Sequence, residues 1–320
     1  MVSKQRLSVD IVVITWNSLD YLKSCLESIY KYTKDISYRL IIIDNGSNDG
    51  TSKFLDKLKE NNSIIVKTNK RNLGAPKAWS QGYELTTSEL VCLVNDDVIV
   101  SPHWLSNLVR VMQDNKNLGI LGPVRPGAQF LHPYTKTLSK VILEESKLKR
   151  KTPWGQLRYF THGKKYETFV EDYKTANKQI LSEFKSLPTI ISTCCALVRR
   201  TAIKKAGGIA DIQFLQYGGE DTDLSWRLIK SGYSLGITSS SYIHHFEHTS
   251  MTKNNVDRQK LLKINSRKLY KKWEREIKSY IKTKIKSGNT KEQILQESWL
   301  LQRLSDAVGN DFWKNINFPK

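Results

Sequence analysis

Apolar residues in the first hundred positions fall into short runs separated by amphipathic stretches. The runs at 9–14, 40–43, 64–66 and 90–94 are rich in Val, Ile and Leu, which is typical of strands buried on both faces of a parallel sheet. The stretches between them carry apolar residues at helical spacing, as at Leu22, Cys25, Leu26 and Ile29. This alternation predicts the α/β class, with a mostly parallel, doubly wound sheet and right-handed crossovers.

The pattern weakens over about 125–185, where aromatic residues are scattered among polar ones and 147–151 is basic. Two interpretations stay open for this region: an insertion on the acceptor side of a site, or a solvated loop with short helices. Strand character returns over 187–198, followed by a short helix that ends at Gly207. An amphipathic helix after the acidic run 220–223, a strand around 235–237 and the histidine-rich run 242–248 complete this part.

A basic region begins near residue 253. Positions 253–286 hold thirteen Lys or Arg and three acids, so they carry half of the chain's net charge of +20. Apolar residues recur there, and again over 294–304, at roughly helical spacing, which predicts a C-terminal helical appendage. Its basic face either binds an anionic membrane surface or a partner, or is simply solvated.

Size and composition limit the class of protein. With 320 residues, 39% hydrophobic and 26% charged, the chain is expected to form one large globular domain plus an appendage. The longest apolar runs are too short to span a bilayer, and the first six residues lead into a strand and not into a signal sequence. We therefore expect a cytoplasmic protein, peripheral at the inner face of the membrane if the basic helix binds lipid.

The net charge indicates a polyanionic partner, which could be nucleic acid, anionic lipid or an anionic substrate. No nucleic-acid-binding signature accompanies it, so we expect no nucleic acid partner. The four cysteines lack the spacing of metal ligands and are expected to be buried thiols.

The run Asn95-Asp96-Asp97 directly follows the apolar residues 90–94. A buried parallel strand delivers such residues to the carboxyl edge of the sheet, where α/β folds bind ligands. Two adjacent carboxylates there repel each other unless a cation or hydrogen-bond donors compensate. A ligand site and a simple Asx-rich turn are the two interpretations of this run taken alone.

Glycine-rich phosphate loops are absent from the sequence. No GxGxxG follows the first strand and no GxxxxGK[ST] occurs, which argues against dinucleotide-binding and P-loop proteins. A nucleotide bound here would be held by the Asp, Asn and Thr residues that end the strands, with a metal to neutralise its phosphates.

Six motifs in order resemble those of one family, the nucleotide-sugar glycosyltransferases of family 2 with the GT-A fold. The motifs lie at 12–17, 43–51, 72–74, 95–97, 219–224 and 244–245, and the resemblance covers about residues 8–250. It implies a glycosyltransferase domain over 1–250, with a nucleotide-binding half (1–100) and an acceptor-side half (101–250). The basic helical region then occupies 251–320.

The resemblance also implies roles for residues on the donor side. Asp44 would accept a hydrogen bond from the base, and Asn95-Asp96-Asp97 stands in the place of the DxD motif, with Asn95 replacing its first Asp. Asp97 is then the expected ligand of Mn²⁺ or Mg²⁺, which bridges the diphosphate. The residues expected at the nucleotide-sugar are Thr15, Asn17, Asp44, Asn45, Arg71, Asn72, Asn95 and Asp96.

On the acceptor side, Glu220-Asp221 resembles the family's catalytic ED motif, in which the Asp is the general base. Asp223 and Arg227 are spaced to form an ion pair within the helix. His245 aligns best with the family's late histidine, which meets the metal or the diphosphate. His244 is the rival for this role, and His248 is a third candidate.

The leading hypothesis is an inverting, metal-dependent hexosyl- or deoxyhexosyltransferase. It would use a UDP-, dTDP- or GDP-linked sugar and a glycan, lipid-linked or protein acceptor, as in polysaccharide biosynthesis. The alternatives are a retaining GT-A transferase, or a basic nucleic-acid- or anion-binding protein with a non-catalytic GT-A fold. The pattern indicates no oligomeric state.

Overall fold

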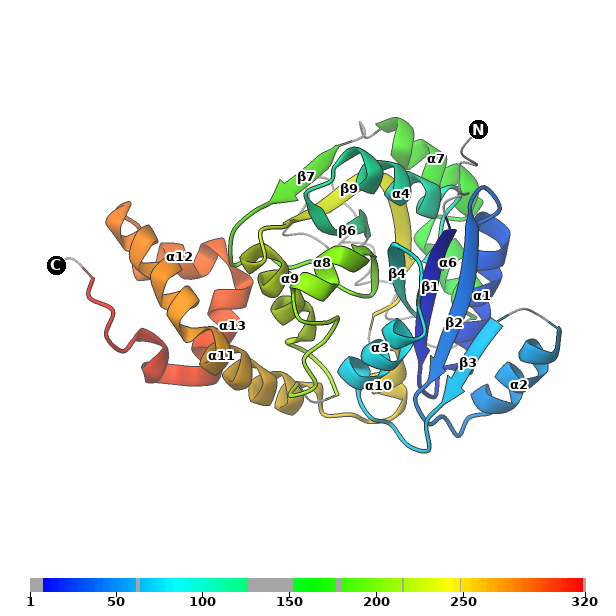
Figure 1. Cartoon of the computed structure of the whole chain (residues 1–320), viewed down its shortest axis with the longest axis horizontal. Coiled ribbons are helices and arrows are strands. Elements are labelled where there is room, and N and C mark those ends of the chain that lie inside the picture. Colours follow the sequence, from blue (N-terminus) through cyan, green and yellow to red (C-terminus); the bar gives the residue numbers. More distant parts are fainter. Residues whose placement is uncertain are drawn as a thin grey trace.

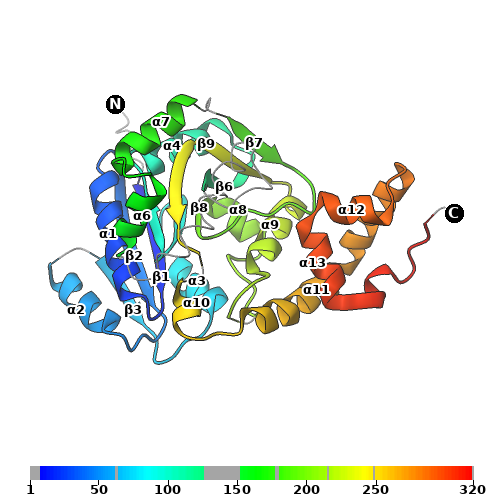
Figure 2. The same ribbon diagram turned by 180° about the vertical axis from the view of Figure 1, so that it is seen from behind.

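The computed structural model describes residues 8–61, 64–125, 152–176, 180–214, 216–247 and 249–318. Within these residues, one mixed sheet runs in the order β3-β2-β1-β4-β8-β6-β9-β5, and β7 pairs with β9. The sheet lies at the centre of the molecule, and the C-terminal helices project from the side opposite β3 (Figures 1 and 2).

The N-terminal half is the predicted alternation of strands and helices. β1, β2, β3 and β4 are parallel neighbours, and the ends of three of them are in register, with Thr15 opposite Asp44 and Ile14 opposite Asn95. The predicted polar strand ends therefore lie at one edge of the sheet. The elements are β1 (Ser8–Thr15), α1 (Leu19–Tyr32), β2 (Ser37–Asp44), α2 (Thr51–Asn61), β3 (Ile64–Thr68), α3 (Ala75–Glu84) and β4 (Leu90–Asn95).

The second half adds antiparallel pairs to the sheet. β8 is antiparallel to both β4 and β6, whereas β6 and β9 are parallel. The elements are β5 (Val98–Val100), α4 (Trp104–Asp114), β6 (Leu118–Val124), α6 (Pro153–Phe160), α7 (Tyr166–Ala176), β7 (Leu181–Phe184), β8 (Cys195–Arg199), α8 (Arg200–Lys205), α9 (Glu220–Lys230), β9 (Ser234–His245) and α10 (Thr249–Lys253).

The predicted strand over 187–198 is wrong for most of its length, because β8 begins only at Cys195. Pro188 has no N–H to donate to a neighbouring strand. The Ile191 N–H donates to Ser225 Oγ of α9, and the Thr189 carbonyl accepts from Trp226 Nε1. These bonds attach the segment to α9 as a loop beside the sheet.

Two further regions differ from their predictions. The strand expected around 235–237 is longer, because β9 continues to His245 and includes the start of the histidine-rich run, with a register irregularity near Tyr242. The described part of the 125–185 region forms α6, α7 and the strand β7, and Phe160, Tyr166 and Tyr173 of the helices are buried, so these helices are packed and not merely solvated. The basic run 147–151 lies outside the described residues.

The C-terminal residues form the predicted helices α11 (Arg258–Lys286), α12 (Lys291–Glu297) and α13 (Trp299–Val308), followed by the 3₁₀ helix η2 (Gly309–Trp313). They surround a second hydrophobic cluster that also contains Phe214 and Trp226 of the preceding part. The cluster therefore crosses the boundary predicted near residue 250, and the domain division itself stays a prediction. In the described ranges, no helix combines the length and apolar character needed to cross a bilayer.

Candidate active site

A cavity of about 320 Å³ opens at the carboxyl edge of the parallel strands. One wall consists of residues at the ends of β1, β2 and β4, and the other of residues from the 187–194 loop, α9 and α13. The sequence-predicted residues that line it are Thr15, Asn45, Asn72, Asn95, Asp96, Asp97, Glu220, Asp221 and His245. Residues from both ends of the chain are thus gathered at one site.

Asn45 joins the loops of the first wall. Its Oδ1 accepts from Asn69 Nδ2 and from the Leu73 N–H, each at 3.0 Å, and its Nδ2 donates to Asn72 Oδ1 at 2.9 Å. Because the amide is bonded on both sides, the loops after β2 and β3 are fixed relative to each other. Asn45 and Asn72 are therefore held in place before any ligand binds.

Asp44, Asn17 and Arg71 do not line this cavity. The Asp44 carboxylate is buried and accepts from the Ser47 N–H and from Ser52 Oγ, and Asn17 Oδ1 accepts from the Asn48 N–H. Arg71 is exposed, and its backbone lies against Gly46. In this structure these residues brace the loops behind the cavity, and their nucleotide contacts stay a prediction.

The two carboxylates after β4 are buried side by side. Asp96 Oδ2 accepts from the Trp16 N–H at 3.3 Å, while Asp97 Oδ1 lies 3.0 Å from His245 Nε2. Burial, together with the charge of Asp97, raises the pKa of Asp96 to about 8. Burial lowers the pKa of His245, but Asp97 and Cys194 outweigh it, so the net pKa lies well above the usual value. Both shifts favour the protonated forms of Asp96 and His245 near neutral pH.

A divalent cation fits this donor set. A carboxylate and an imidazole, Asp97 and His245, converge in the cavity, and both ligand types suit Mn²⁺. The described residues contain no group of three or more His, Cys, Asp or Glu placed to hold an ion. Two protein ligands are nevertheless enough for a cation whose remaining ligands are substrate phosphates and water.

His244 points away from the cavity. Successive side chains of a strand alternate between its faces, so His244 and His245 of β9 face opposite ways. The His244 ring is fully buried and packs against Phe160 and Phe246, with centroid separations of 4.7 and 4.6 Å. This geometry favours His245 over His244 as the ligand. His248 lies outside the described residues.

The acidic motif begins α9. Gly219, with φ of 101°, precedes Glu220 at the helix N-terminus. Thr193 Oγ1 of the adjacent loop donates to Asp221 Oδ1 at 2.5 Å. Burial raises the pKa of Asp221, although the Thr193 hydrogen bond opposes it. Burial and the Asp221 charge raise the pKa of Glu220 to about 8. Asp221 is therefore a half-buried, oriented carboxylate that lines the cavity.

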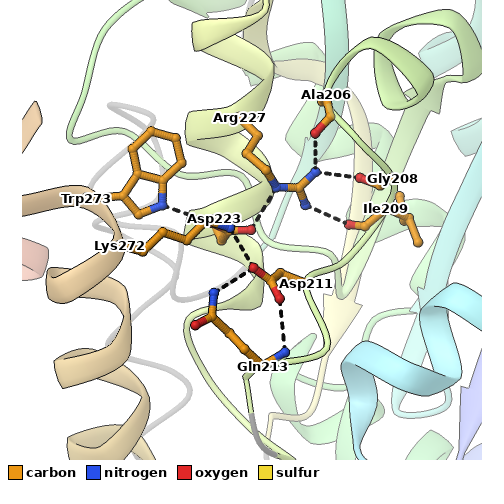
Figure 3. Close-up of polar contacts among 9 residues, drawn as sticks. All are labelled: Ala206, Gly208, Ile209, Asp211, Gln213, Asp223, Arg227, Lys272 and Trp273. Carbon is orange, nitrogen blue, oxygen red and sulfur yellow. Dashed lines mark hydrogen bonds and ion pairs between the residues drawn. The ribbon is translucent and has the colours of Figure 1, made fainter.

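The base of this helix is tied to α11 (Figure 3). Asp223 is fully buried and accepts from Arg227 Nε at 2.8 Å, which confirms the predicted pair, and from Trp273 Nε1 at 2.9 Å. Lys272 Nζ lies 2.6 Å from Asp223 Oδ1 and 2.7 Å from Asp211 Oδ2. The C-terminal region thus fixes the turn of helix that carries Asp221.

Several cavity residues were not predicted from the sequence, and four of them matter most for the chemistry proposed below. Arg125 follows β6, a strand whose Gly119, Gly122 and Pro123 hide its apolar pattern. Thr193 lies in the segment predicted as a strand. Trp299 and Arg303 belong to α13, and their i,i+4 spacing was visible only as part of an amphipathic helix. These four residues are Arg125, Thr193, Trp299 and Arg303.

Comparison with known proteins places this arrangement in context. The model of a family described as "Glycosyl transferase family 2" matches residues 10–207. A Bacillus subtilis relative named "Uncharacterized glycosyltransferase YfnE" is 22% identical over 77% of this chain and 67% of its own length. A Proteus mirabilis undecaprenyl-phosphate 4-deoxy-4-formamido-L-arabinose transferase is 28% identical over 42% of this chain, and the match spans 41% of that relative.

Two solved structures share the fold. A mannosyltransferase from Pyrobaculum calidifontis, in complex with GDP-Man and Mn²⁺, has a TM-score of 0.53 at 14% identity and covers 98% of this chain and 77% of its own. Residues 1–349 of TarS from S. aureus, in complex with UDP-GlcNAc, have a TM-score of 0.50 at 15% identity, covering 97% and 76%. These likenesses confirm the predicted fold class.

Proposed function

Because the chain belongs to glycosyl transferase family 2, we propose that it is an inverting, divalent-metal-dependent transferase of sugars from nucleotide diphosphates. One observation carries the proposal. Asp97 and His245, suited to a diphosphate-bound cation, and Asp221, suited to a general base, open onto the same cavity. A donor and an acceptor bound in this cavity would meet between them.

The first wall would hold the donor. Asn45 and Asn72 are fixed amides, Thr15 and Asn95 end neighbouring strands, and Asp96 lies between Trp16 and the metal position. In this proposal Asp44 accepts from the base, with Asn17 and Arg71 near the nucleotide. Arg71 supplies positive charge at the surface, where a diphosphate could approach it.

Asp97 and His245 would hold Mn²⁺ or Mg²⁺. When bound, the cation would neutralise the diphosphate and make it a better leaving group. The Mn²⁺ in the structure of the similar mannosyltransferase supports the choice of a divalent cation. Asp97 and His245 would position it beside the donor, and its positive charge would favour the deprotonated forms of Asp96 and His245.

Asp221 would act as the base. Its raised pKa brings it closer to neutral pH, which favours proton transfer from an acceptor hydroxyl. The acceptor oxygen forms a bond to the anomeric carbon, the bond from that carbon to the diphosphate breaks, and Asp221 takes the proton. A single displacement inverts the anomeric configuration. A product with retained configuration, observed by NMR, would favour the retaining alternative.

A donor panel tests the proposal. Purified protein is incubated with UDP-, GDP- and dTDP-sugars and Mn²⁺, Mg²⁺ or EDTA, and nucleoside diphosphate release is measured. We expect one donor to be consumed, only with metal, and consumption to be lost in Asp97→Ala. If no donor is bound or consumed with either metal, the proposal fails.

The exposed face of α11 supports an anionic membrane surface as a partner. Basic residues recur there every three or four positions through most of the helix: Lys260, Lys263, Arg267, Lys271, Arg275, Lys282 and Lys286. The helix's acids are engaged elsewhere, since Glu274 pairs with Lys278, Glu276 pairs with Lys230, and Asp257 caps the N-terminus. A lipid-linked acceptor would lie at such a surface.

Flotation with vesicles tests the membrane contact. Vesicles with about a third of anionic lipid at low salt should carry the chain, whereas neutral vesicles or high salt should not. Reversing Lys263, Lys271 and Arg275 to Glu should abolish flotation, and reversing Lys53, Lys57 and Lys59 of α2 should not. If the wild type does not float at low salt, the proposed membrane contact is wrong. Salt-sensitive binding of arbitrary nucleic acid instead would favour the nucleic-acid alternative.

A further inference from the structure

A second cavity, of about 240 Å³, adjoins the first beside the N-terminus of α13. The two cavities share Arg125, Ile190, Ser192, Cys194 and Trp299. The space beyond the proposed base therefore continues past the indole of Trp299. Neither the donor nor the cation of the proposed function needs this space.

Trp299 presents apolar surface at this junction. Trp299 lines both cavities, and 37% of the residue is exposed, which is unusual for so large an apolar residue. The Arg303 guanidinium lies 4.9 Å from the ring centroid, one helical turn further along α13. Ser298 caps the helix by accepting from the Leu301 N–H, which fixes the first turn. The indole and the guanidinium are thus held together by a rigid helix.

Two of the described residues on this side of the first cavity each have a buried polar atom without a hydrogen-bond partner. Among the residues that the structure describes, Glu220 Oε2 and Arg303 Nε are buried and have no hydrogen-bond partner. Both residues line the first cavity. A buried polar atom without a partner is costly, and a ligand that supplies the partner recovers that cost. Glu220 Oε2 needs a hydrogen-bond donor and Arg303 Nε needs an acceptor. Two adjacent hydroxyl groups of one ligand can supply both, because a hydroxyl group can donate or accept.

We propose that Trp299, Arg303 and Glu220 form an acceptor subsite for a sugar residue, and that the second cavity receives the next residue of the same glycan. The apolar C–H face of the sugar stacks on the exposed part of the indole. One hydroxyl donates to Glu220 and a neighbouring hydroxyl accepts from Arg303. The nucleophilic hydroxyl of that sugar then faces Asp221. This inference rests on the proposed function and assigns its acceptor to the carbohydrates.

Binding without donor tests the subsite directly. The probes are methyl β-glucoside, β-galactoside and α-rhamnoside, with methyl β-cellobioside and β-lactoside as the two-residue forms, and saturation-transfer NMR measures their contacts with the full chain. We expect at least one glycoside to bind. If it is the glucoside or the galactoside, the matching two-residue form (the cellobioside or the lactoside) should bind more tightly. Affinity should fall about tenfold or more in Trp299→Ala and in Arg303→Met, and less in Trp299→Phe.

Matched controls keep the test specific. Gln302→Ala changes an exposed residue of the same helix, and Tyr159→Ala removes an exposed aromatic residue, 43% exposed, from α6. Neither should alter binding. If no glycoside binds the wild type, or if Trp299→Ala and Arg303→Met bind like the wild type while folded by circular dichroism, the subsite is overturned.

Kinetics separate this proposal from the proposed function. With a donor that is consumed, the KM for the acceptor glycoside should rise about tenfold in Trp299→Ala, while the KM for the donor stays within about twofold. Sugar binding without consumption of any donor would contradict the transferase proposal and keep the sugar subsite. Consumption of a donor with no transfer to any of these sugars would contradict the subsite as an acceptor site.

Discussion

Trp273 Nε1 of α11 donates a hydrogen bond of 2.9 Å to Asp223, two residues after Asp221. Asp223 is fully buried, and Arg227 and Lys272 also contact its carboxylate (Figure 3). The basic C-terminal region, predicted as an appendage, is therefore joined to the helix that carries the proposed base. The C-terminal region also supplies Trp299 to the lining of the cavity.

Removing the indole N–H should weaken this junction. In Trp273→Phe, the Asp223 carboxylate loses one donor, which should cost about 1–3 kcal/mol of unfolding free energy, measured by urea denaturation. The lost hydrogen bond holds α9 and does not touch the cavity wall formed by the ends of β1, β2 and β4. We therefore expect kcat to fall several-fold with little change in the KM for the donor. Equal losses in kcat and in donor affinity would contradict this positioning role.

The matched control is Trp313→Phe. Its Nε1 donates to Ser305 Oγ within the same C-terminal cluster, remote from Asp223. This variant should lose stability without a change in kcat.

Gly46 should tolerate no side chain. Its φ is 81°, and a Cβ placed on it would lie 2.5 Å from the backbone carbonyl carbon of Arg71. Gly46→Ala should therefore separate the loops after β2 and β3 and cost about 2 kcal/mol or more of unfolding free energy, together with donor affinity. Gly288→Ala is the control, because its φ is 84° but a Cβ would meet nothing within 4 Å. It should cost only about 1 kcal/mol, and equal effects would contradict the steric argument.

Glu220 should make the folded state less stable as the pH rises. Burial and Asp221 raise its pKa to about 8 in the folded state, from the usual 4.5. The folded chain then binds a proton that the unfolded chain has released, so stability falls between pH 4.5 and pH 8. Glu220→Gln should be more stable than the wild type at pH 8, and the gain should shrink toward pH 5, measured by urea denaturation without nucleotide.

The exposed Glu84 of α3 provides the control for this pH effect. Glu84→Gln should show no pH-dependent gain. A Glu220→Gln gain that is equal at pH 5 and pH 8 would contradict the linkage.

The structure of the first hundred residues was well predicted from the sequence for a local reason. There, each strand is a continuous apolar run that ends in a polar residue, so the run alone places Thr15, Asp44 and Asn95 at one edge of the sheet. The strand β6 was not predicted, because Gly119, Gly122 and Pro123 interrupt its apolar pattern. Thr193 was missed because the apolar run beside it predicts a strand, whereas its backbone is bonded to α9 and not to the sheet.

Trp299 and Arg303 could not be assigned from their own sequence. An amphipathic helix indicates that one face is buried, but its position over the cavity depends on α11 packing against α9 through Trp273 and Trp226, whose rings lie 5.5 Å apart. That contact joins residues distant in the chain. Asp97 and His245, the proposed metal ligands, were easier to place at the cavity, because each lies at the end of a strand within a motif that resembles the family.

Donor binding and sugar transfer, measured side by side in Asp97→Asn and Asp221→Asn with Mn²⁺ and the donor that the panel identifies, test the central claim most directly. If Asp97 holds the cation and Asp221 is the base, Asp97→Asn weakens donor binding, whereas Asp221→Asn binds the donor like the wild type and loses transfer by about 10²–10⁴-fold. Transfer that survives in Asp221→Asn, or donor binding that is unchanged in Asp97→Asn, would contradict this division of roles.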